Sequence, residues 1–396
     1  MLAKIYDLLI IFLVIAASLL VGYVVWNRDN IFKSVSQALN PPNEPENLIP
    51  VSAQIDSKWL PYTTPIRNKN IYVKPGLQSI VFAAGLNLPQ VLTLVDNFVV
   101  ISEVQTGNIV VLEDSDYDNS SDIKYIFDSN LSHPYGLGYY NGDLYVATDR
   151  SLLVYKNFIS QFNNKTSNNE ILVNNLPMGG LNPYKSLLVG PNNRIYVSIG
   201  SSCQSCVELD KRRGSIVSYD LNGEGEEIFA TGFKNISGME FLKGALYVTD
   251  EGINSSKNIG LDEIDKVYGG KFYGWPYIYN VNTVNTEYSQ IPLDLEQNYT
   301  GPEVNFETGV NPSGLAYINF DDTIFSGLML VSLRGNALTL GHKIIAYNVD
   351  TKEYEDIISF QKEDANYLAS PTDVIGYRKG ILVSDKLNGI IYYFGE

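Results

Sequence analysis

Beyond about residue 70, short apolar runs alternate with polar turns, and the same unit recurs six times. Each unit opens on a segment with Pro or Gly, and after a turn it contains a strand of the form Leu-Tyr-Val that ends in a small or acidic residue. Runs of β-branched and aromatic residues between Gly, Asn and Asp predict strands joined as hairpins. The Leu-Tyr-Val strands are predicted at residues 99–102, 144–147, 195–198, 246–249, 329–332 and 381–384.

These units recur at a spacing close to that of propeller blades. No stretch after residue 70 has a convincing helical period, so parallel βαβ folds are excluded. One four-stranded sheet cannot bury both of its faces, whereas six sheets stacked radially bury them and leave only short edges. The sequence therefore predicts an all-β fold, a six-bladed β-propeller over residues 71–396, although seven blades remain an alternative. We expect residues 390–394 to close the ring by pairing with residues 71–73 or 80–83.

The N-terminus carries a separate apolar segment. Residues 8–26 contain no charged side chain, and a helix of that length, at about 1.5 Å per residue, spans a hydrocarbon core. This pattern predicts one transmembrane helix as a membrane anchor over residues 1–29. A cleaved signal peptide is the alternative, although its apolar region is usually shorter. Repeated prolines in residues 30–70 predict a semi-rigid, Pro-rich linker.

Composition narrows the range of partners. The formal net charge of −16 repels phosphate backbones, so nucleic acid is excluded as a partner. The 28 tyrosines and 32 glycines suit strands and tight turns better than helices. The chain is therefore expected to present a folded, acidic, strand-rich body.

Cys203 and Cys206 are the only two cysteines of the chain. A redox-active Cys-x-x-Cys pair usually opens a helix in a βαβ setting. This pair instead follows a predicted strand and lies in a Ser-rich turn. Outside the cytoplasm we expect a local disulfide between the two.

The opening residues of the innermost strands should meet at one mouth of the propeller's axial channel. The set is polar and includes one of the two histidines of the chain. Each Asn alone fits equally well as a turn former that bonds local backbone, whereas the set as a whole predicts a ligand-binding mouth. Its members are Leu88, His133, Asn182, Lys234 with Asn235, Asn311 and Ser370.

Three segments resemble the glucose/sorbosone dehydrogenase family. They are residues 190–206, residues 231–235, and the pair formed by residues 262–264 and 273–276. The resemblance extends over roughly residues 70–396. It implies a six-bladed propeller that binds pyrroloquinoline quinone (PQQ) with Ca²⁺, works outside the cytoplasm, and oxidises the anomeric carbon of aldoses or related aldehydes. We therefore expect the N-terminus inside and the propeller outside the cell membrane.

The resemblance also assigns roles to particular residues, and this chain departs from some of them. The family's catalytic His falls at Asn182, whose neutral amide cannot accept a proton. Lys234 replaces an Arg that holds the cofactor's carboxylates, and Asn235 and Arg334 complete the predicted cofactor site. Another cofactor-binding Arg is replaced by Ser370. Two backbone carbonyls would bind Ca²⁺, those of Gly252 and Ile253. His133, one blade earlier, is a candidate substitute base, or only a turn residue.

Two functions follow from this pattern. The first is a membrane-anchored, extracytoplasmic quinoprotein sugar dehydrogenase that passes electrons to a membrane acceptor. The second is a catalytically inactive propeller that binds glycans or proteins at the cell surface. The resemblance favours the first function, and the substitutions at Asn182, Lys234 and Ser370 favour the second.

Overall fold

The computed structural model describes residues 47–255, 258–335, 341–360 and 368–396. These residues belong to one compact unit. The predicted anchor, and the part of the predicted linker before residue 47, lie outside the described residues. Among the residues that the structure describes, no helix is long and apolar enough to cross a membrane.

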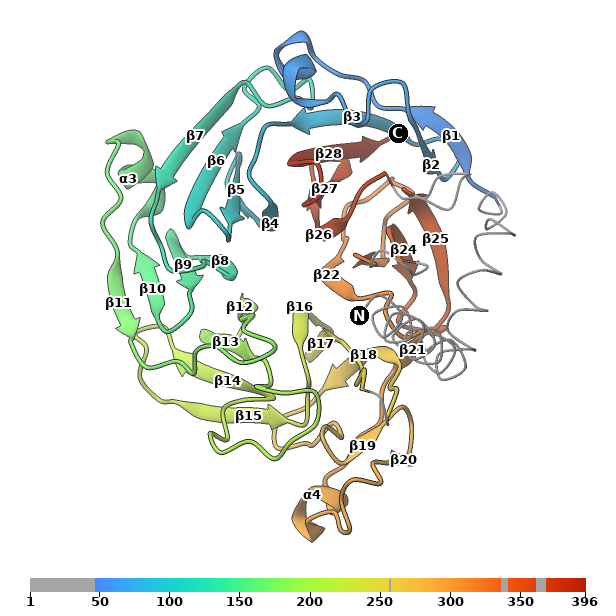
Figure 1. Ribbon diagram of the computed structural model, residues 1–396. Helices are drawn as coiled ribbons and strands as arrows, with labels where there is room; N and C mark the ends of the chain where they lie inside the picture. The colour runs from blue at the N-terminus through green and yellow to red at the C-terminus, as the bar shows by residue number, and fades with distance from the viewer. Residues whose placement is uncertain (1–46, 256–257, 336–340, 361–367) are drawn as a thin grey trace, which may run out of the picture. The chain divides into compact units, whose positions relative to one another are not determined.

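Six antiparallel sheets are arranged radially around a common axis, which confirms the six-bladed β-propeller (Figure 1). In each blade the strands run from the axis outward in chain order, except that the outermost strand of the sixth blade comes from the start of the described chain. The first blade contains β4 (Pro89–Val95), β5 (Phe98–Glu103), β6 (Asn108–Glu113) and β7 (Ile123–Asp128), and the second contains β8 (Gly136–Tyr140), β9 (Asp143–Ala147), β10 (Leu152–Tyr155) and β11 (Glu170–Val173). The third blade contains β12 (Leu187–Val189), β13 (Arg194–Ile199), β14 (Ser215–Asp220) and β15 (Glu227–Thr231), and the fourth contains β16 (Ile236–Leu242), β17 (Ala245–Asp250), β18 (Asp262–Val267) and β21 (Val304–Phe306). The fifth blade contains β22 (Pro312–Tyr317), β23 (Met329–Leu333), β24 (Lys343–Tyr347) and β25 (Tyr354–Ser359), and the sixth contains β26 (Pro371–Tyr377), β27 (Gly380–Asp385), β28 (Ile390–Gly395) and β3 (Gln78–Ala83).

The last strand closes the ring as expected. Strand β28 pairs with β3, and Tyr392 lies opposite Val81. Of the two candidate partners, residues 80–83 are therefore right and residues 71–73 are wrong. The latter lie in β2 (Asn70–Val73), which instead pairs with β25 at the outer edge of the fifth blade.

The body of the protein begins before residue 71, so the predicted linker is too long at its C-terminal end. Strand β1 (Ile49–Ser52) pairs with β2, and a 3₁₀ helix, η1 (Ser57–Tyr62), follows it. Trp59 in η1 is only 6% exposed, and its Nε1 donates a hydrogen bond to Ser120 Oγ at 3.1 Å. The prolines that suggested a linker are compatible with this structure, because an edge strand and a short 3₁₀ helix both tolerate proline.

The second strand of each blade carries the Leu-Tyr-Val pattern and is almost entirely buried. Every residue of β17, β23 and β27 is buried. Each blade packs between two neighbours, so both faces of its central strands are covered. This explains why these strands are continuous apolar runs instead of alternating ones.

The small hydroxyl residue that ends several of these strands connects adjacent blades. Thr249, at the end of β17, accepts a hydrogen bond from the backbone N–H of Gly238 at 2.8 Å and donates one to the carbonyl of Ser313 in the next blade at 2.8 Å. Ser198 donates in the same way to the carbonyl of Ile236. In the second blade the equivalent residue is Ala147, which has no hydroxyl group. These bonds satisfy backbone groups that an inner strand would otherwise leave unpaired near the axis.

Candidate functional site

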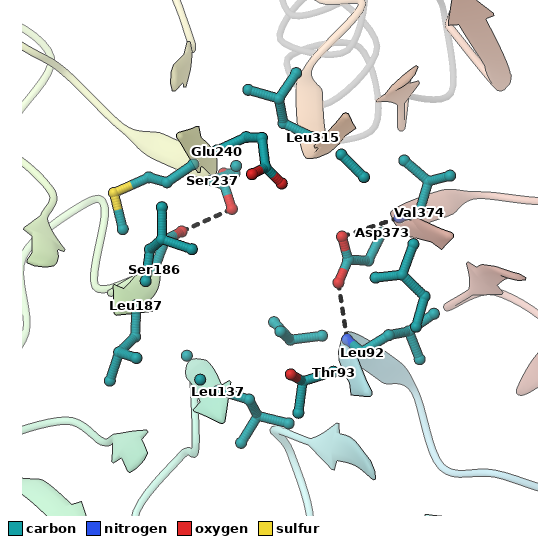
Figure 2. Close-up of a pocket in the computed structure, with 18 of the residues that line it drawn as sticks. Leu92, Thr93, Leu137, Ser186, Leu187, Ser237, Glu240, Leu315, Asp373 and Val374 are labelled. Carbon is teal, nitrogen blue, oxygen red and sulfur yellow. Dashed lines mark hydrogen bonds between the residues drawn. The ribbon is translucent and has the colours of Figure 1, made fainter. Parts of the chain in front are cut away.

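The six inner strands surround an axial cavity of about 420 Å³. Figure 2 shows the side chains of Glu240, from β16, and Asp373, from β26, projecting into it. Asp373 accepts hydrogen bonds from the backbone N–H groups of Leu92, in the first blade, and Val374. Burial raises the pKa of Asp373 and of Glu240 to about 7. The walls of the cavity therefore combine apolar and polar side chains, and two of the polar ones are weakly acidic carboxyl groups.

His133 lies at the opening of the second blade, just before β8. Its Nδ1 is 2.7 Å from Asp149 Oδ2, which also accepts a hydrogen bond from Ser132 Oγ at 2.8 Å. The ring stacks on Tyr135, which lines the axial cavity, with 5.8 Å between centroids. The side chain of His133 is 45% exposed. The predicted mouth residue therefore lies beside the cavity with one edge open to solvent.

The neighbouring carboxylate determines which nitrogen of His133 is free. Burial raises the pKa of Asp149, but hydrogen bonds from His133 and Ser132 outweigh it and the net pKa lies below its usual value. An ionised carboxylate only accepts hydrogen bonds, so Nδ1 carries the proton in this pair. Nε2 of the neutral ring is then free to accept a proton.

Asn182 is buried and has structural hydrogen bonds. It is 7% exposed, and its Nδ2 donates to Ser201 Oγ at 2.8 Å. Gly200 packs against it so closely that a Cβ there would lie 2.3 Å from the Asn182 carbonyl oxygen. The position that the family resemblance assigns to the base therefore holds a buried amide that bonds a neighbouring hydroxyl group.

Lys185 is a buried cation that the sequence analysis did not identify. It is 1% exposed, its Nζ donates to the carbonyl of Pro183 at 3.2 Å, and it lies 5.6 Å from the ring centroid of Tyr135. Burial lowers its pKa to about 8, although Asp149 opposes this effect. A lysine three residues beyond a turn gives no sequence signal of burial, so only the fold identifies it.

Other cations lie on the far side of the mouth, around Glu251. The Glu251 carboxylate is 2.8 Å from Arg334 Nη2 and 3.9 Å from Lys234 Nζ. Lys386, which the sequence analysis also missed, donates to Gln90 Oε1 at 3.2 Å. Burial lowers the pKa of Lys386, and the positive charge of Arg334 lowers it further. Three cations from different loops therefore lie close to the axial cavity, which both Arg334 and Gln90 line.

Asn235, Gly252 and Ile253 lie in the fourth blade near Lys234. Asn235 is 2% exposed, and its backbone N–H donates to Asp250. A Cβ at Gly252 would lie 2.3 Å from the carbonyl oxygen of Leu261, so only glycine fits there. The carbonyl of Ile253 already accepts a hydrogen bond from the backbone N–H of Gly260 at 2.6 Å. Only its second lone pair is free for a cation, so the calcium role of Gly252 and Ile253 stays a prediction.

The disulfide between Cys203 and Cys206 is present, which confirms that prediction. An insertion in the fourth blade holds the disulfide loop in place. This insertion contains β19 (Ile278–Tyr279), β20 (Thr283–Val284) and α4 (Leu293–Gln297). Trp275 Nε1 donates to the carbonyl of Gln204 at 2.9 Å, and Asn285 Nδ2 donates to Ser205 Oγ at 2.9 Å.

Hydrogen bonds and ion pairs place four of the predicted site residues, His133, Asn182, Lys234 and Arg334, in two groups. His133 contacts Asp149 and Tyr135 on one side. On the other, a chain of contacts runs from Asn182 through Ser201, whose N–H donates to the carbonyl of Lys234 at 2.9 Å, and on through Glu251 to Arg334. The mouth therefore combines one candidate base with a set of cations.

Solved structures share the fold of this chain. A solved pyranose dehydrogenase PQQ domain from Coprinopsis cinerea, in its holo form, has a TM-score of 0.68 at 11% identity, covering 82% of this chain and 97% of that one. A calcium structure of a Trichoderma reesei family AA12 carbohydrate-active enzyme has a TM-score of 0.67 at 13% identity, covering 82% and 96%. At these identities the likeness shows the fold.

Sequence comparison is more specific about the family. An uncharacterized protein of Borreliella burgdorferi is 26% identical over 295 residues, which cover 68% of this chain and 77% of the relative. The profile of the family described as glucose/sorbosone dehydrogenase matches residues 144–353, which is more than half of the chain. The chain belongs to the glucose/sorbosone dehydrogenase family.

Proposed function

We propose that the protein is a sugar dehydrogenase that oxidises an anomeric or aldehyde carbon at the mouth of the axial cavity, with His133 as its general base. One observation carries this proposal: His133 is paired with Asp149 through Nδ1 at 2.7 Å and remains 45% exposed. A base needs a nitrogen that can accept a proton and access to substrate. Nε2 of His133 meets both requirements, whereas the amide of Asn182 cannot accept a proton.

The proton transfer follows from this pair. The O–H proton of the substrate passes to Nε2 of His133, while the electrons of its C–H bond leave as a hydride and the carbon becomes a carbonyl. Asp149 holds the ring in the correct tautomer and stabilises the imidazolium that forms. His133 thereby supplies the base that the family places one blade later.

The cations at the mouth fit a cofactor that carries several carboxylates. Arg334, Lys234 and Lys386 would hold those carboxylates, Arg334 by two parallel hydrogen bonds and the lysines as point charges. PQQ, when bound, would accept the hydride. Glu251 now neutralises Arg334 and Lys234, so the cofactor's carboxylates would replace it as their partner. We propose Ca²⁺ at the carbonyls of Gly252 and Ile253 by the same family relationship.

We further propose that the propeller works outside the cytoplasm, anchored by the apolar segment of residues 8–26 and passing electrons to a membrane acceptor. The disulfide between Cys203 and Cys206 supports an oxidising compartment. N-terminal sequencing of the mature protein tests the anchor, because a chain that begins after residue 17 would indicate a cleaved signal peptide instead.

The activity is tested by titrating the full chain with PQQ and Ca²⁺ and measuring dye-linked oxidation of aldoses. His133→Ala should lower the rate about 10²–10⁴-fold, the usual effect of removing a general base. Asp149→Asn should lower it as well and shift its pH profile, because an amide no longer fixes the tautomer. Asn182→His with Lys234→Arg tests the family's own base position. A rate that His133→Ala leaves unchanged would refute the assignment of the base.

A second candidate function is a glycan-binding propeller without catalysis. The pairing of Glu251 with both Lys234 and Arg334 favours it, because these cations already have a partner. Calorimetric titration with monosaccharides and oligosaccharides separates the two functions. Sugar binding by a protein that binds no PQQ in any variant would support the second.

A further inference from the structure

The loop that carries the disulfide, residues 202–213, shows apolar side chains to solvent and turns charged ones inward. Val207 is 59% exposed, and Leu209 is 102% exposed, so no part of the body covers it. The charged residues that alternate with them, Glu208, Asp210 and Arg212, are only partly exposed. A surface loop in water usually has the opposite arrangement, because apolar side chains gain from burial and charged ones lose by it.

Hydrogen bonds within the loop hold its charged residues inward. Glu208 accepts hydrogen bonds from the hydroxyl group of Ser202 at 2.8 Å and from the backbone N–H of the same residue. Arg212 Nη2 donates to Asp210 Oδ2 at 2.8 Å, and its Nε donates to Oδ1 at 3.0 Å. Turning the loop over would break these bonds. The exposure of its two apolar side chains is therefore built into the loop.

The loop is also fixed to the body of the propeller. The disulfide closes its first turn. Asn285, in the insertion of the fourth blade, donates to Ser205 Oγ at 2.9 Å, and the backbone N–H of Leu181 donates to the carbonyl of Ser202 at 3.0 Å. An ordered loop loses little conformational entropy when it binds. Its apolar tip is therefore preorganised for contact with a partner.

The segments that are hydrogen-bonded to the loop expose further apolar side chains. One segment precedes β12, and the other is the insertion, which projects from the rim of the ring (Figure 1). Single exposed apolar residues are ordinary, whereas a group of them marks an interaction surface. We call this group the apolar ridge; each member is at least 50% exposed, and its members are Met178, Leu181, Val207, Leu209, Val281 and Val284.

We propose that the apolar ridge docks onto the surface of a zwitterionic lipid bilayer, with Val207 and Leu209 entering it. This docking depends on the anchor proposed above at residues 8–26, and it adds which part of the body meets the membrane. The described chain begins at residue 47, and residues 27–46 span at most about 70 Å even when fully extended. An anchored body stays within that distance of the bilayer, and the high effective concentration allows a small apolar contact to form.

The chemistry of the ridge favours lipid over a protein partner. Protein interfaces concentrate their binding energy in Trp, Tyr and Arg, whereas the ridge consists of Val, Leu and Met. Lys211 is exposed two residues beyond Leu209, and a lysine at a bilayer surface lays its stem along the apolar region and keeps its ammonium group among the headgroups. The net charge of −16 gives no attraction to anionic lipid, so the headgroups are expected to be zwitterionic.

Docking of the ridge would bring the mouth to the membrane. Ser201 directly precedes the loop, and its N–H donates to the carbonyl of Lys234 in the mouth at 2.9 Å. A docked loop therefore places the mouth at the bilayer surface, beside any electron acceptor that the lipid holds.

The test uses the full chain in phosphatidylcholine vesicles, with a tryptophan as reporter at the tip of the loop. The fluorescence that Leu209→Trp adds to that of the three native tryptophans is the signal. Interfacial groups enter a bilayer by about 5–10 Å, so lipids brominated in the upper part of the acyl chains should quench this signal at least about twofold. Iodide in the water should leave it nearly unchanged.

Two further variants make the result specific. Ile126→Trp places the reporter on β7 of the first blade, on the other side of the ring, where Ile126 is 54% exposed. Iodide should quench this control and brominated lipid should not. Adding Val207→Asp to Leu209→Trp places a charge in the proposed contact, so it should return the reporter to water and restore quenching by iodide.

Each alternative gives a different result. The docking proposal is overturned if the chain floats with the vesicles while iodide quenches the Leu209→Trp signal and brominated lipid does not. Protection from both quenchers would show that protein covers the loop, either a second copy or another partner, and would also overturn it. A chain that does not float with the vesicles would refute the anchor itself, and the docking with it. None of these readouts depends on the dehydrogenase activity.

Discussion

The hydroxyl of Thr249 offers a direct test of how the blades are joined. Thr249→Val keeps the shape of the side chain and removes both of its hydrogen bonds, which leaves the N–H of Gly238 and the carbonyl of Ser313 unpaired in the interior. Thr249 itself is 0% exposed, so water cannot replace the lost partners. We expect the change to destabilise the junction between the fourth and fifth blades.

The size of the effect follows from those two orphaned groups. Each buried polar group that loses its partner costs about 1–3 kcal/mol, so the two groups together should lower the free energy of unfolding of Thr249→Val by about 2–6 kcal/mol. In a domain of this size a loss of 1 kcal/mol lowers the melting temperature by about 1.5 °C. The melting temperature should therefore fall by about 3–9 °C.

Circular dichroism at a fixed Ca²⁺ concentration and scan rate measures this shift. Thr249→Ser keeps the hydroxyl and loses only a methyl group, so it should melt well above Thr249→Val. The exposed residue Thr351 provides the control Thr351→Val, with an expected change below about 0.5 kcal/mol. If Thr249→Ser loses as much as Thr249→Val, the hydrogen bonds do not hold the junction and the reasoning fails.

Three further changes test other parts of the molecule. Arg378→Met leaves the fully buried carboxylate of Asp114 without its cation, so it should lower the free energy of unfolding, measured by urea titration, by about 2–4 kcal/mol. An equal loss of stability in the exposed neighbour, Lys379→Met, would contradict this prediction. Replacing Cys203 and Cys206 by Ser opens a very short loop, so it should lower the free energy of unfolding by less than about 2 kcal/mol. A larger loss of free energy, measured from the melting temperature, would contradict the idea that the insertion of the fourth blade holds this loop in place. Burial raises the pKa of Asp373 to about 7, against about 4 in the unfolded chain. The folded protein therefore favours the protonated carboxyl, so the contribution of Asp373 to stability is present below about pH 4 and is lost as the pH rises toward 7. Asp373→Asn should therefore reduce the difference in melting temperature between pH 5 and pH 8, and an unchanged difference would count against it.

Much of the fold could be predicted because each blade repeats one local pattern. The Leu-Tyr-Val strands are buried on both faces, so their apolar runs are conspicuous in the sequence. Strands β1 and β2 could not be placed in this way, because they belong to no repeat: β1 pairs only with β2, and β2 pairs with β25, near the other end of the chain. Their prolines also resembled those of a linker.

The site was less predictable, because its chemistry depends on partners distant in sequence. His133 was identifiable as a rare residue at a strand opening, but its pairing with Asp149 depends on the turn after β9. The burial of Lys185 and Lys386 follows from how neighbouring blades pack.

The pairing of β3 with β28 has a consequence for biosynthesis. The ribosome makes β3 roughly 300 residues before its partner, which at 5–20 residues per second is a wait of about 15–60 s. Throughout that time the first strand of the ring has a free edge, and free edges recruit other chains. Strand β2 waits in the same way for β25. The nascent chain therefore needs a chaperone, or passage through a translocation channel, until its final residues emerge.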